Sequence, residues 1–292
     1  MIRPLIRTLR QHNRQLTNEL LFEPLNEGRR ARLLANYFSW HLLHKYCRRR
    51  WIIRFDNGLK SYVYPYPDHD AGEVNIWTRN VDWHDINLVR SILKQGDFVV
   101  DAGCNVGNRT LAIADLIDGA LLIDAGDVAA ARTRENLELN RLPREQFIVL
   151  NKAVGSRCGP VTFTDLGGAS TLNRVVEPGD TTVSTVTIDM TTLDAELDRI
   201  GRKPSFLKID VEGQDLEVLR GSIVTLRSGS VRLVKFERNA TEPLEPIVDF
   251  FGELGWSVFA LRKTGEMTQE NGVLQKNMNL FAAPGQVFRQ IS

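Results

Sequence analysis

Short apolar runs alternate with amphipathic segments along most of the chain. The apolar runs are rich in β-branched residues and too short for helices, which is typical of buried strands. We expect seven strands, at residues 98–100, 121–124, 147–150, 206–210, 231–237, 256–261 and 279–283. We expect helices between them, at residues 82–93, 111–117, 128–140, 193–200, 215–226 and 244–254. This alternation predicts an α/β fold with a doubly wound, mostly parallel sheet.

The connection between the last two expected strands has a different pattern. It is a polar segment with Gly265 and Gly272, and its helical pattern is too short for a crossover. We therefore expect these two strands to pair antiparallel. The predicted sheet is mixed, with an antiparallel edge.

The first part of the chain is organised differently. Leucines recur there at helical spacing, and the sequence Asp-Asn-Gly at residues 56–58 separates two short apolar runs, which is a strong hairpin signal. We predict an N-terminal helical and hairpin extension over residues 1–83, packed over the mouth of a main domain at residues 84–292. Candidate substrate contacts in the extension and at its junction with the main domain are Asp68, His69 and His84.

A glycine turn follows the first expected strand of the main domain, with the sequence Asp-Ala-Gly-Cys-Asn-Val-Gly at residues 101–107. Gly103 and Gly107 permit a sharp turn and a close approach of a ligand. The free N–H groups of the next helix point into this turn, and Asn105 is a candidate N-cap. Dinucleotide-binding folds carry Gly-x-Gly-x-x-Gly at this place. This chain has Cys104 and Asn105 where the second glycine would fall, and side chains there would obstruct a pyrophosphate. The pattern therefore favours a nucleotide-like cofactor that has no pyrophosphate.

A second cofactor signal lies on the next strand. Asp124 ends that strand about 20 residues after the turn, where an acidic residue commonly holds a ribose. The two features together predict a cofactor site. The alternative is a plain βαβ unit in which the glycine turn is incidental.

Polar residues follow the fourth and fifth expected strands. These are Asp210 and Glu212 after the fourth, and Glu237 and Asn239 after the fifth. The carboxyl ends of parallel strands border the ligand crevice of such sheets, so a carboxylate there could act as a general base. Oxygen ligands would also suit Mg²⁺. The structural alternative is that Glu212 caps a helix and Glu237 pairs with a lysine.

Composition and charge narrow the class of protein. The chain has 292 residues, of which 42% are hydrophobic and 25% charged, as in ordinary globular proteins. Residues 1–54 hold eleven arginines and one lysine against three glutamates, a net charge of +9, so the remainder carries −8 of the total +1. This basic segment suits a phosphate-rich or membrane-surface partner, or docking on the acidic domain. It lacks the interleaved aromatic residues of an RNA-binding module, so we do not expect a nucleic-acid partner.

Cysteine usage and hydropathy indicate the compartment. Cys47, Cys104 and Cys158 lie far apart and form no metal-binding pair, which favours a reducing environment. No apolar run approaches the roughly 18 residues of a membrane span. Arginines interrupt the first apolar residues, unlike a secretory signal. We expect a cytoplasmic protein.

Several motifs together resemble the FkbM family of S-adenosylmethionine-dependent O-methyltransferases, over roughly residues 80–285. The similar segments are residues 101–107, the strand end at Asp124, and residues 136–140, 153–154, 168–172, 187–189 and 207–213. The last of these, Leu-Lys-Ile-Asp-Val-Glu-Gly, is the most specific. The chain departs from the family at residues 123–125, where Ile-Asp-Ala replaces the common Phe-Glu-Pro. The carboxylate there is one methylene shorter, and the turn lacks its proline.

The resemblance implies a Rossmann-like class I methyltransferase fold with a seven-stranded mixed sheet and an antiparallel final strand. It implies a hydroxyl acceptor on a small molecule, of the sugar or natural-product type. The implied S-adenosyl-L-methionine site comprises Asp101, Gly103, Asn105, Gly107, Asp124, Asn151, Ala153 and Asp210. The catalytic candidates are Asp210, Glu212 and Glu237, and Asp210, Glu237 and Asn239 are the candidate ligands of a divalent cation such as magnesium. A catalytically silent binding protein and an NAD-dependent oxidoreductase are the alternatives.

Overall fold

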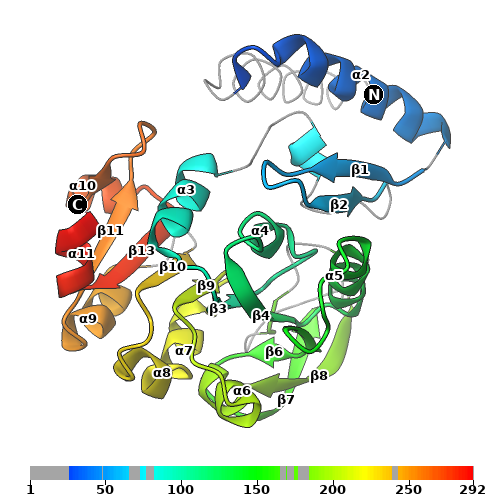
Figure 1. Cartoon of the computed structure of the whole chain (residues 1–292). Coiled ribbons are helices and arrows are strands. Elements are labelled where there is room, and N and C mark those ends of the chain that lie inside the picture. The colour runs from blue at the N-terminus through cyan, green and yellow to red at the C-terminus, as the bar shows by residue number, and fades with distance from the viewer. Residues whose placement is uncertain are drawn as a thin grey trace, which may run out of the picture.

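An eight-stranded mixed sheet forms the centre of the molecule (Figure 1). The computed structural model describes residues 26–47, 49–65, 73–76, 82–164, 169, 174–176, 184–238 and 243–291. In spatial order the strands are β12 (Met267–Thr268), β11 (Trp256–Leu261), β13 (Asn279–Pro284), β10 (Leu233–Glu237), β9 (Phe206–Ile209), β3 (Asp97–Ala102), β4 (Ile117–Asp124) and β5 (Phe147–Asn151).

The strand directions confirm a mixed sheet with an antiparallel final strand. Strands β5, β4, β3, β9 and β10 are parallel, and β13 is antiparallel to both of its neighbours, β10 and β11. The expected pairing of the last two long strands, β11 and β13, is therefore confirmed. Their predicted place was wrong in one respect, because β13 inserts between β10 and β11 and is not the edge strand. The two-residue strand β12, which was not expected, pairs with β11 outside it.

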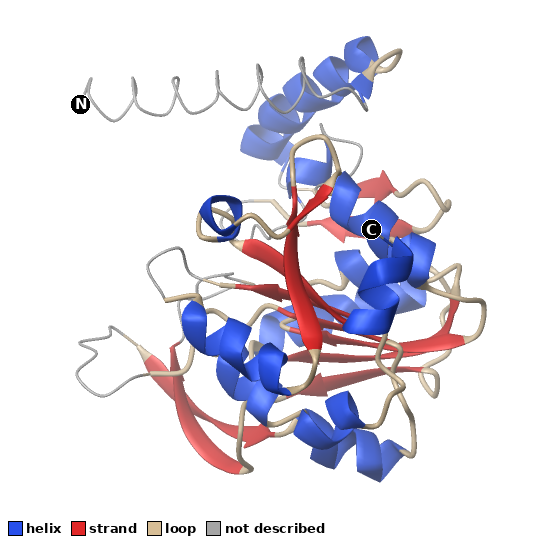
Figure 2. Ribbon diagram, turned by 90° about the vertical axis from the view of Figure 1, so that its left-hand side faces the viewer, coloured by secondary structure: helices blue, strands red, loops and turns tan. Residues whose placement is uncertain are grey.

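Helices cover both faces of the sheet, as Figures 1 and 2 show. Alternate strand residues point to opposite faces, so Val99 joins one core cluster while Phe98 and Val100 join the other. The first cluster contains side chains of α3 (Trp83–Ile92), α4 (Asn108–Leu111) and α11 (Gly285–Ile291). The second contains side chains of α6 (Leu193–Ile200), α7 (Asp215–Arg220), α8 (Ile223–Arg227), α9 (Glu245–Glu253) and α10 (Asn271–Leu274). The result is a three-layer α/β/α domain.

The segment after the glycine turn differs from the prediction of a helix over residues 111–117. Helix α4 ends at Leu111, and β4 already begins at Ile117. Side chains from other elements take the carbonyl groups that a longer helix would use, since Asn57 donates to the Leu111 carbonyl and Arg90 to the Ala112 carbonyl. The apolar residues here are buried in the core without forming a helical face.

A smaller three-stranded sheet lies beside the main one, at the lower right of Figure 1. Its order is β6 (Ala153–Val154), β8 (Thr185–Thr191) and β7 (Gly159–Thr164), with β7 and β8 antiparallel. Helix α5 (Asp127–Leu139) packs against β4 and β5 of the main sheet.

The described part of the N-terminal extension contains α2 (Arg30–Cys47), η3 (Glu73–Ile76) and the hairpin of β1 (Trp51–Arg54) and β2 (Lys60–Val63). The hairpin at residues 56–58 is confirmed. Backbone N–H groups of Lys60 and Tyr62 donate to the side chains of Asn140 and Asn136, which attaches the hairpin to the α5 region. None of the described helices combines the length and the apolar character that crossing a membrane requires.

Candidate functional site

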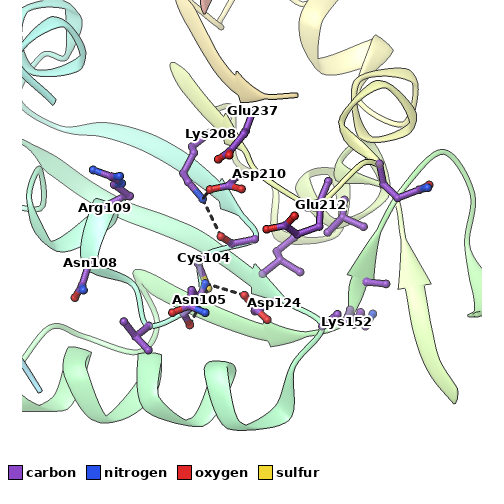
Figure 3. Close-up of a pocket in the computed structure, with 18 of the residues that line it drawn as sticks. Cys104, Asn105, Asn108, Arg109, Asp124, Lys152, Lys208, Asp210, Glu212 and Glu237 are labelled. Carbon is purple, nitrogen blue, oxygen red and sulfur yellow. Dashed lines mark hydrogen bonds and ion pairs between the residues drawn. The ribbon is translucent and has the colours of Figure 1, made fainter. Parts of the chain in front are cut away.

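A cavity of about 360 Å³ lies at the carboxyl ends of β3, β4, β9 and β10 (Figure 3). Its size is that of a small-molecule site, and its place is where open α/β sheets bind ligands. The glycine turn and the strand ends form its floor. Phe55 and Asn75 of the extension and Phe163 and Val175 near the small sheet also line it. Segments far apart in sequence therefore enclose one space.

The glycine turn packs directly against the segment that follows β9. Gly103 has φ +73°, and a Cβ atom there would lie 1.8 Å from the backbone oxygen of Asp210. Only glycine fits this close approach. Gly107 has φ +79° and occupies the N-cap of α4. Asn105 is therefore not the N-cap, and its side chain donates to the Ala169 carbonyl instead.

Asp124 lies at the end of β4 and faces the cavity. One carboxylate oxygen accepts the N–H of Asn105 at 2.7 Å, and the other accepts the N–H of Gly126 at 2.9 Å. Burial raises the pKa of Asp124 to about 6. Each oxygen keeps a further lone pair, so the carboxylate can still accept hydrogen bonds from a ligand. Asp124 therefore remains suited to bind ribose hydroxyls, although its side chain is one methylene shorter than the glutamate common in the family.

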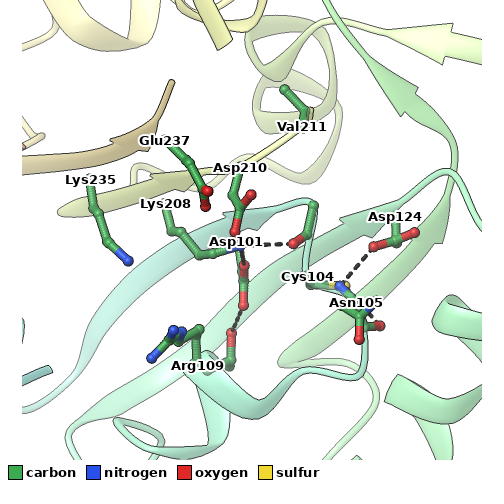
Figure 4. Close-up of polar contacts among 12 residues, drawn as sticks. Asp101, Cys104, Asn105, Arg109, Asp124, Lys208, Asp210, Val211, Lys235 and Glu237 are labelled. Atoms are coloured by element: carbon green, nitrogen blue, oxygen red, sulfur yellow. Dashed lines mark hydrogen bonds and ion pairs between the residues drawn. The ribbon is translucent and has the colours of Figure 1, made fainter. Parts of the chain in front are cut away.

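A buried lysine connects the turn to the acids (Figure 4). The Nζ atom of Lys208 donates to the Gly103 carbonyl at 2.8 Å and lies 3.1 Å from Asp101 and 3.2 Å from Asp210. These charges raise the pKa of Lys208 against the opposing effect of burial. Asp101 also accepts the hydroxyl of Thr110 at 2.8 Å. Asp101 thus stabilises the turn through Lys208 and Thr110, and it does not line the cavity.

Asp210 and Glu237 meet at the ends of the neighbouring strands β9 and β10. Their carboxyl groups lie side by side, and both residues line the cavity (Figures 3 and 4). Burial and the charge of Asp210 raise the pKa of Glu237 to about 7. Burial opposes the ionisation of Asp210 as well, but Lys208 and Lys235 lower its pKa overall. The pair is therefore suited to accept or donate a proton near neutral pH.

Glu212 also lines the cavity, on a backbone with φ +48°. Burial and the charge of Asp210 raise its pKa. The structure thus brings together all three predicted catalytic acids. Of the predicted cofactor residues, the cavity is lined by Gly103, Asn105, Asp124, Ala153 and Asp210.

The other predicted residues lie elsewhere. Gly107 and Asn151 do not line the cavity. Gly107 shapes the turn as the N-cap of α4. The Asn151 side-chain amide donates to the carbonyls of Asp124 and Ala125 at 3.0 and 2.9 Å. His84 packs against Gly265 instead. The described residues contain no group of three or more His, Cys, Asp or Glu side chains arranged for a metal ion. Three candidates, Asp68, His69 and Asn239, lie outside the described residues.

The role of Asp215 and the partner of Lys235 were not expected from the sequence. Asp215 of α7 is buried, and its two oxygens accept the N–H groups of Val211 and Glu237. Burial and the charge of Asp210 raise the pKa of Asp215 to about 8. Lys235 lies 3.1 Å from Asp85 of α3, a partner 150 positions away that no local motif indicates.

Solved structures of similar shape include methyltransferase FkbM from Methylobacillus flagellatus KT, with 12% identity and a TM-score of 0.44. The match covers 86% of this chain and 60% of that protein, so the chain spans less than two thirds of its length. SMU.1697c from Streptococcus mutans, in complex with SAH, has 12% identity and a TM-score of 0.42 over 68% and 94% of the two chains. Precorrin-6y C5,15-methyltransferase from Geobacter metallireducens GS-15 has 10% identity and a TM-score of 0.40 over 78% and 93%.

Sequence comparison decides the family. No curated protein matches the chain significantly. The family described as the methyltransferase FkbM domain matches residues 77–257, which is more than half of the chain. This match decides against the alternative of an NAD-dependent oxidoreductase. The chain belongs to the FkbM methyltransferase family.

Proposed function

We propose that this methyltransferase transfers the methyl group of S-adenosylmethionine to a hydroxyl of a small molecule, of the sugar or natural-product type. The observation that best supports this proposal is one cavity with two kinds of acid. Asp124 faces it from β4 with lone pairs for ribose hydroxyls, and the Asp210–Glu237 pair faces it from β9 and β10.

The residues at the β4 end fit the cofactor. The amide oxygens of Asn105 and Asn108 accept no hydrogen bond from any described residue, and both residues line the cavity. Unpaired acceptors of this kind suit a ligand rich in donors, such as the hydroxyl and ammonium groups of S-adenosylmethionine. Ala153, Val154 and Phe163 provide an apolar wall suited to the adenine base. When bound, the cofactor supplies an electrophilic methyl group on a sulfonium.

The residues at the β9 and β10 ends fit the acceptor chemistry. The enzyme must hold the acceptor oxygen in line with the methyl group and must remove the hydroxyl proton. The Asp210–Glu237 pair is the proposed base. Phe55 and Asn75 of the extension line the same cavity, so we also propose that the extension over residues 1–83 closes the acceptor side of the domain at residues 84–292.

Cofactor binding can be tested without knowing the acceptor. S-adenosylhomocysteine should raise the melting temperature, because a ligand that binds only the native state stabilises it, and NAD should leave it unchanged. A shift with NAD and none with S-adenosylhomocysteine would contradict the proposal.

Methyl transfer requires an acceptor screen. Incubation with S-adenosylmethionine carrying a labelled methyl group and a panel of hydroxyl compounds should label at least one of them. On that compound, Asp210→Asn, Glu212→Gln and Glu237→Gln separate the roles of the three acids. Loss of the base should lower kcat about 10²–10⁴-fold while S-adenosylhomocysteine affinity stays near normal. Full turnover in all three variants would assign the acids a structural role, and binding without any transfer would favour the catalytically silent alternative.

A further inference from the structure

We propose that Asn136 of α5 is a positioning residue that couples the N-terminal extension to the cofactor site. Its side-chain amide joins the hairpin of the extension to the glycine turn, so that docking of the hairpin holds the turn in its binding conformation. This inference rests on the proposed function. It adds that the extension serves the cofactor side of the cavity as well as the acceptor side.

The amide of Asn136 is hydrogen-bonded at both of its ends. Its oxygen accepts the backbone N–H of Tyr62 at 2.8 Å, and its nitrogen donates to the backbone carbonyl of Val106 at 2.8 Å. Tyr62 belongs to β2 of the extension, whereas Val106 lies in the glycine turn and lines the cavity. An amide has its acceptor on one atom and its donors on the other, so only one orientation of this side chain satisfies both partners.

Burial makes this connection depend on the hairpin. Only 1% of the surface of Asn136 is exposed, so the docked hairpin keeps water away from both hydrogen bonds. A buried polar group that loses its partner carries the full cost of its lost hydration, which holds the amide in place. If the hairpin leaves, water competes for both bonds and the side chain regains its other rotamers. The carbonyl of Val106 then loses a fixed partner.

One face of α5 serves both segments, and Figure 1 shows β2 beside this helix. Thr133, Asn136 and Asn140 are three and four positions apart, which places them on the same side of a helix. Thr133 is buried, and its hydroxyl donates to the carbonyl of Asn105 in the turn at 2.7 Å. Asn140 accepts the N–H of Lys60 at 2.8 Å and donates to the carbonyl of Lys60 at 2.6 Å. Thr133 therefore contacts the turn, Asn140 contacts the hairpin, and Asn136 contacts both.

The turn residue held by Asn136 lies between two residues that shape the cofactor site. Asn105 precedes Val106, and its N–H donates to Asp124 at 2.7 Å. Gly107 follows Val106 and is the N-cap of α4. A displaced Val106 carbonyl therefore disturbs the backbone that holds Asp124, the proposed ribose contact. Coupling is reciprocal, so cofactor binding must stabilise the docked hairpin by the factor by which docking strengthens binding.

Two asparagine variants compare the double connection with a single one. Asn136→Leu removes the bonds to both segments, whereas Asn140→Leu removes bonds to Lys60 and to its own helix and keeps the Asn136 connection. Titration calorimetry should show an S-adenosylhomocysteine affinity at least about fivefold lower in Asn136→Leu, as common coupling factors require. Asn140→Leu should stay within about twofold of wild type. The melting temperature should fall in both variants, so the affinity separates coupling from a purely structural role.

A second pair of variants acts from the extension alone. Tyr62→Pro deletes the N–H that donates to Asn136 and leaves Asn136 unchanged. Both strands of the two-stranded hairpin are edge strands, which tolerate proline. Tyr62→Ala keeps the N–H and removes only the ring, which packs on Arg50 and Tyr64. Tyr62 does not line the cavity, yet Tyr62→Pro should bind S-adenosylhomocysteine at least about fivefold more weakly than Tyr62→Ala.

Hydrogen exchange measures the reciprocal effect. Saturating S-adenosylhomocysteine should slow exchange of the Tyr62 backbone amide in the wild-type protein and in Asn140→Leu, and should leave it unchanged in Asn136→Leu.

The inference is overturned if Asn136→Leu binds S-adenosylhomocysteine as well as Asn140→Leu does, or if Tyr62→Pro binds it as well as Tyr62→Ala does. If Asn136→Leu does not fold, the Tyr62 pair decides. If Tyr62→Pro does not fold, the wild-type exchange decides, and an exchange rate of the Tyr62 amide that ignores the ligand overturns the inference. If S-adenosylhomocysteine does not bind the wild-type protein at all, the proposed function itself fails.

Discussion

The ammonium nitrogen of Lys208 lies 3.1 Å from a carboxylate oxygen of Asp101, its register partner on the neighbouring parallel strand. Both residues are almost completely buried, with 5% and 2% of their surface exposed. The same nitrogen donates to the carbonyl of Gly103. Burying two charges is costly, so such a pair contributes little net stability compared with apolar residues. Its effect here is to hold the glycine turn against β9.

Removing one partner of this network should be strongly destabilising. Lys208→Met keeps the length of the side chain but leaves Asp101 buried without its cation. We expect the free energy of unfolding to fall by about 3–5 kcal/mol, measured by denaturant titration. Lys203→Met, on an exposed side chain, is the control and should change it by less than about 0.5 kcal/mol. Equal effects of the two substitutions would show that the buried pair does not hold the turn.

The close approach of the turn to β9 predicts that Gly103→Ala is more damaging than backbone strain alone explains. Gly103 and Gly201 have similar φ values, +73° and +65°, but a Cβ atom at Gly201 would meet nothing within 4 Å. Gly201→Ala should cost about 1–2 kcal/mol from its positive φ. Gly103→Ala should cost more, because the Cβ atom would lie 1.8 Å from the Asp210 oxygen, and it should also weaken S-adenosylhomocysteine binding. Thermal unfolding and calorimetry of both variants compare these costs, and equal stability losses would argue against the clash.

Local patterns explain what the sequence predicts well. The β-branched apolar runs, the Asp-Asn-Gly turn at residues 56–58 and the glycine turn each involve neighbouring residues. Parallel strands end at one edge of a sheet, so placing Asp124, Asp210 and Glu237 at strand ends was enough to expect them near one cavity.

Features that depend on distant residues could not be predicted in this way. Strand β13 inserts beside β10 through pairing that no local pattern encodes. Helix α4 ends at Leu111, where side chains from other elements, Asn57 and Arg90, donate to the carbonyls of Leu111 and Ala112. The contact of Lys235 with Asp85 likewise joins a strand to a helix far away in the sequence. Each of these outcomes is decided by tertiary contacts.

The position of Asp124 predicts a selective loss of cofactor affinity in Asp124→Ala. A charged acceptor that loses its hydrogen bonds to a ligand commonly costs about 1.5–3 kcal/mol, so S-adenosylhomocysteine affinity should fall at least about tenfold. The chain should remain folded, because the Asp124 side chain belongs to neither of the two large core clusters. Asp127→Ala, an exposed residue at the start of α5, is the matched control for titration calorimetry. Unchanged affinity in Asp124→Ala would refute its role toward the ribose.

The burial of Asp215 predicts a pH-dependent contribution to stability. Its pKa is about 8 in the native state, above the ordinary value of 3.8, so the native state keeps a proton that the unfolded chain loses. The stabilising contribution is therefore complete below about pH 4 and is lost as the pH rises toward 8. Asn has the shape of the neutral acid but does not titrate in this range.

The free energy of unfolding of the wild-type protein, relative to that of Asp215→Asn, should accordingly fall between pH 5 and pH 8. The expected slope is roughly 1 kcal/mol per pH unit, measured by denaturant titration at several pH values. Asp249→Asn, at an exposed position on α9, corrects for the removal of one negative charge. The backbone N–H groups of Val211 and Glu237 both donate to Asp215, so its protonation state also affects the ends of the two strands that carry the acids. A constant difference between wild type and Asp215→Asn across this range would show that Asp215 is ionised in the native state.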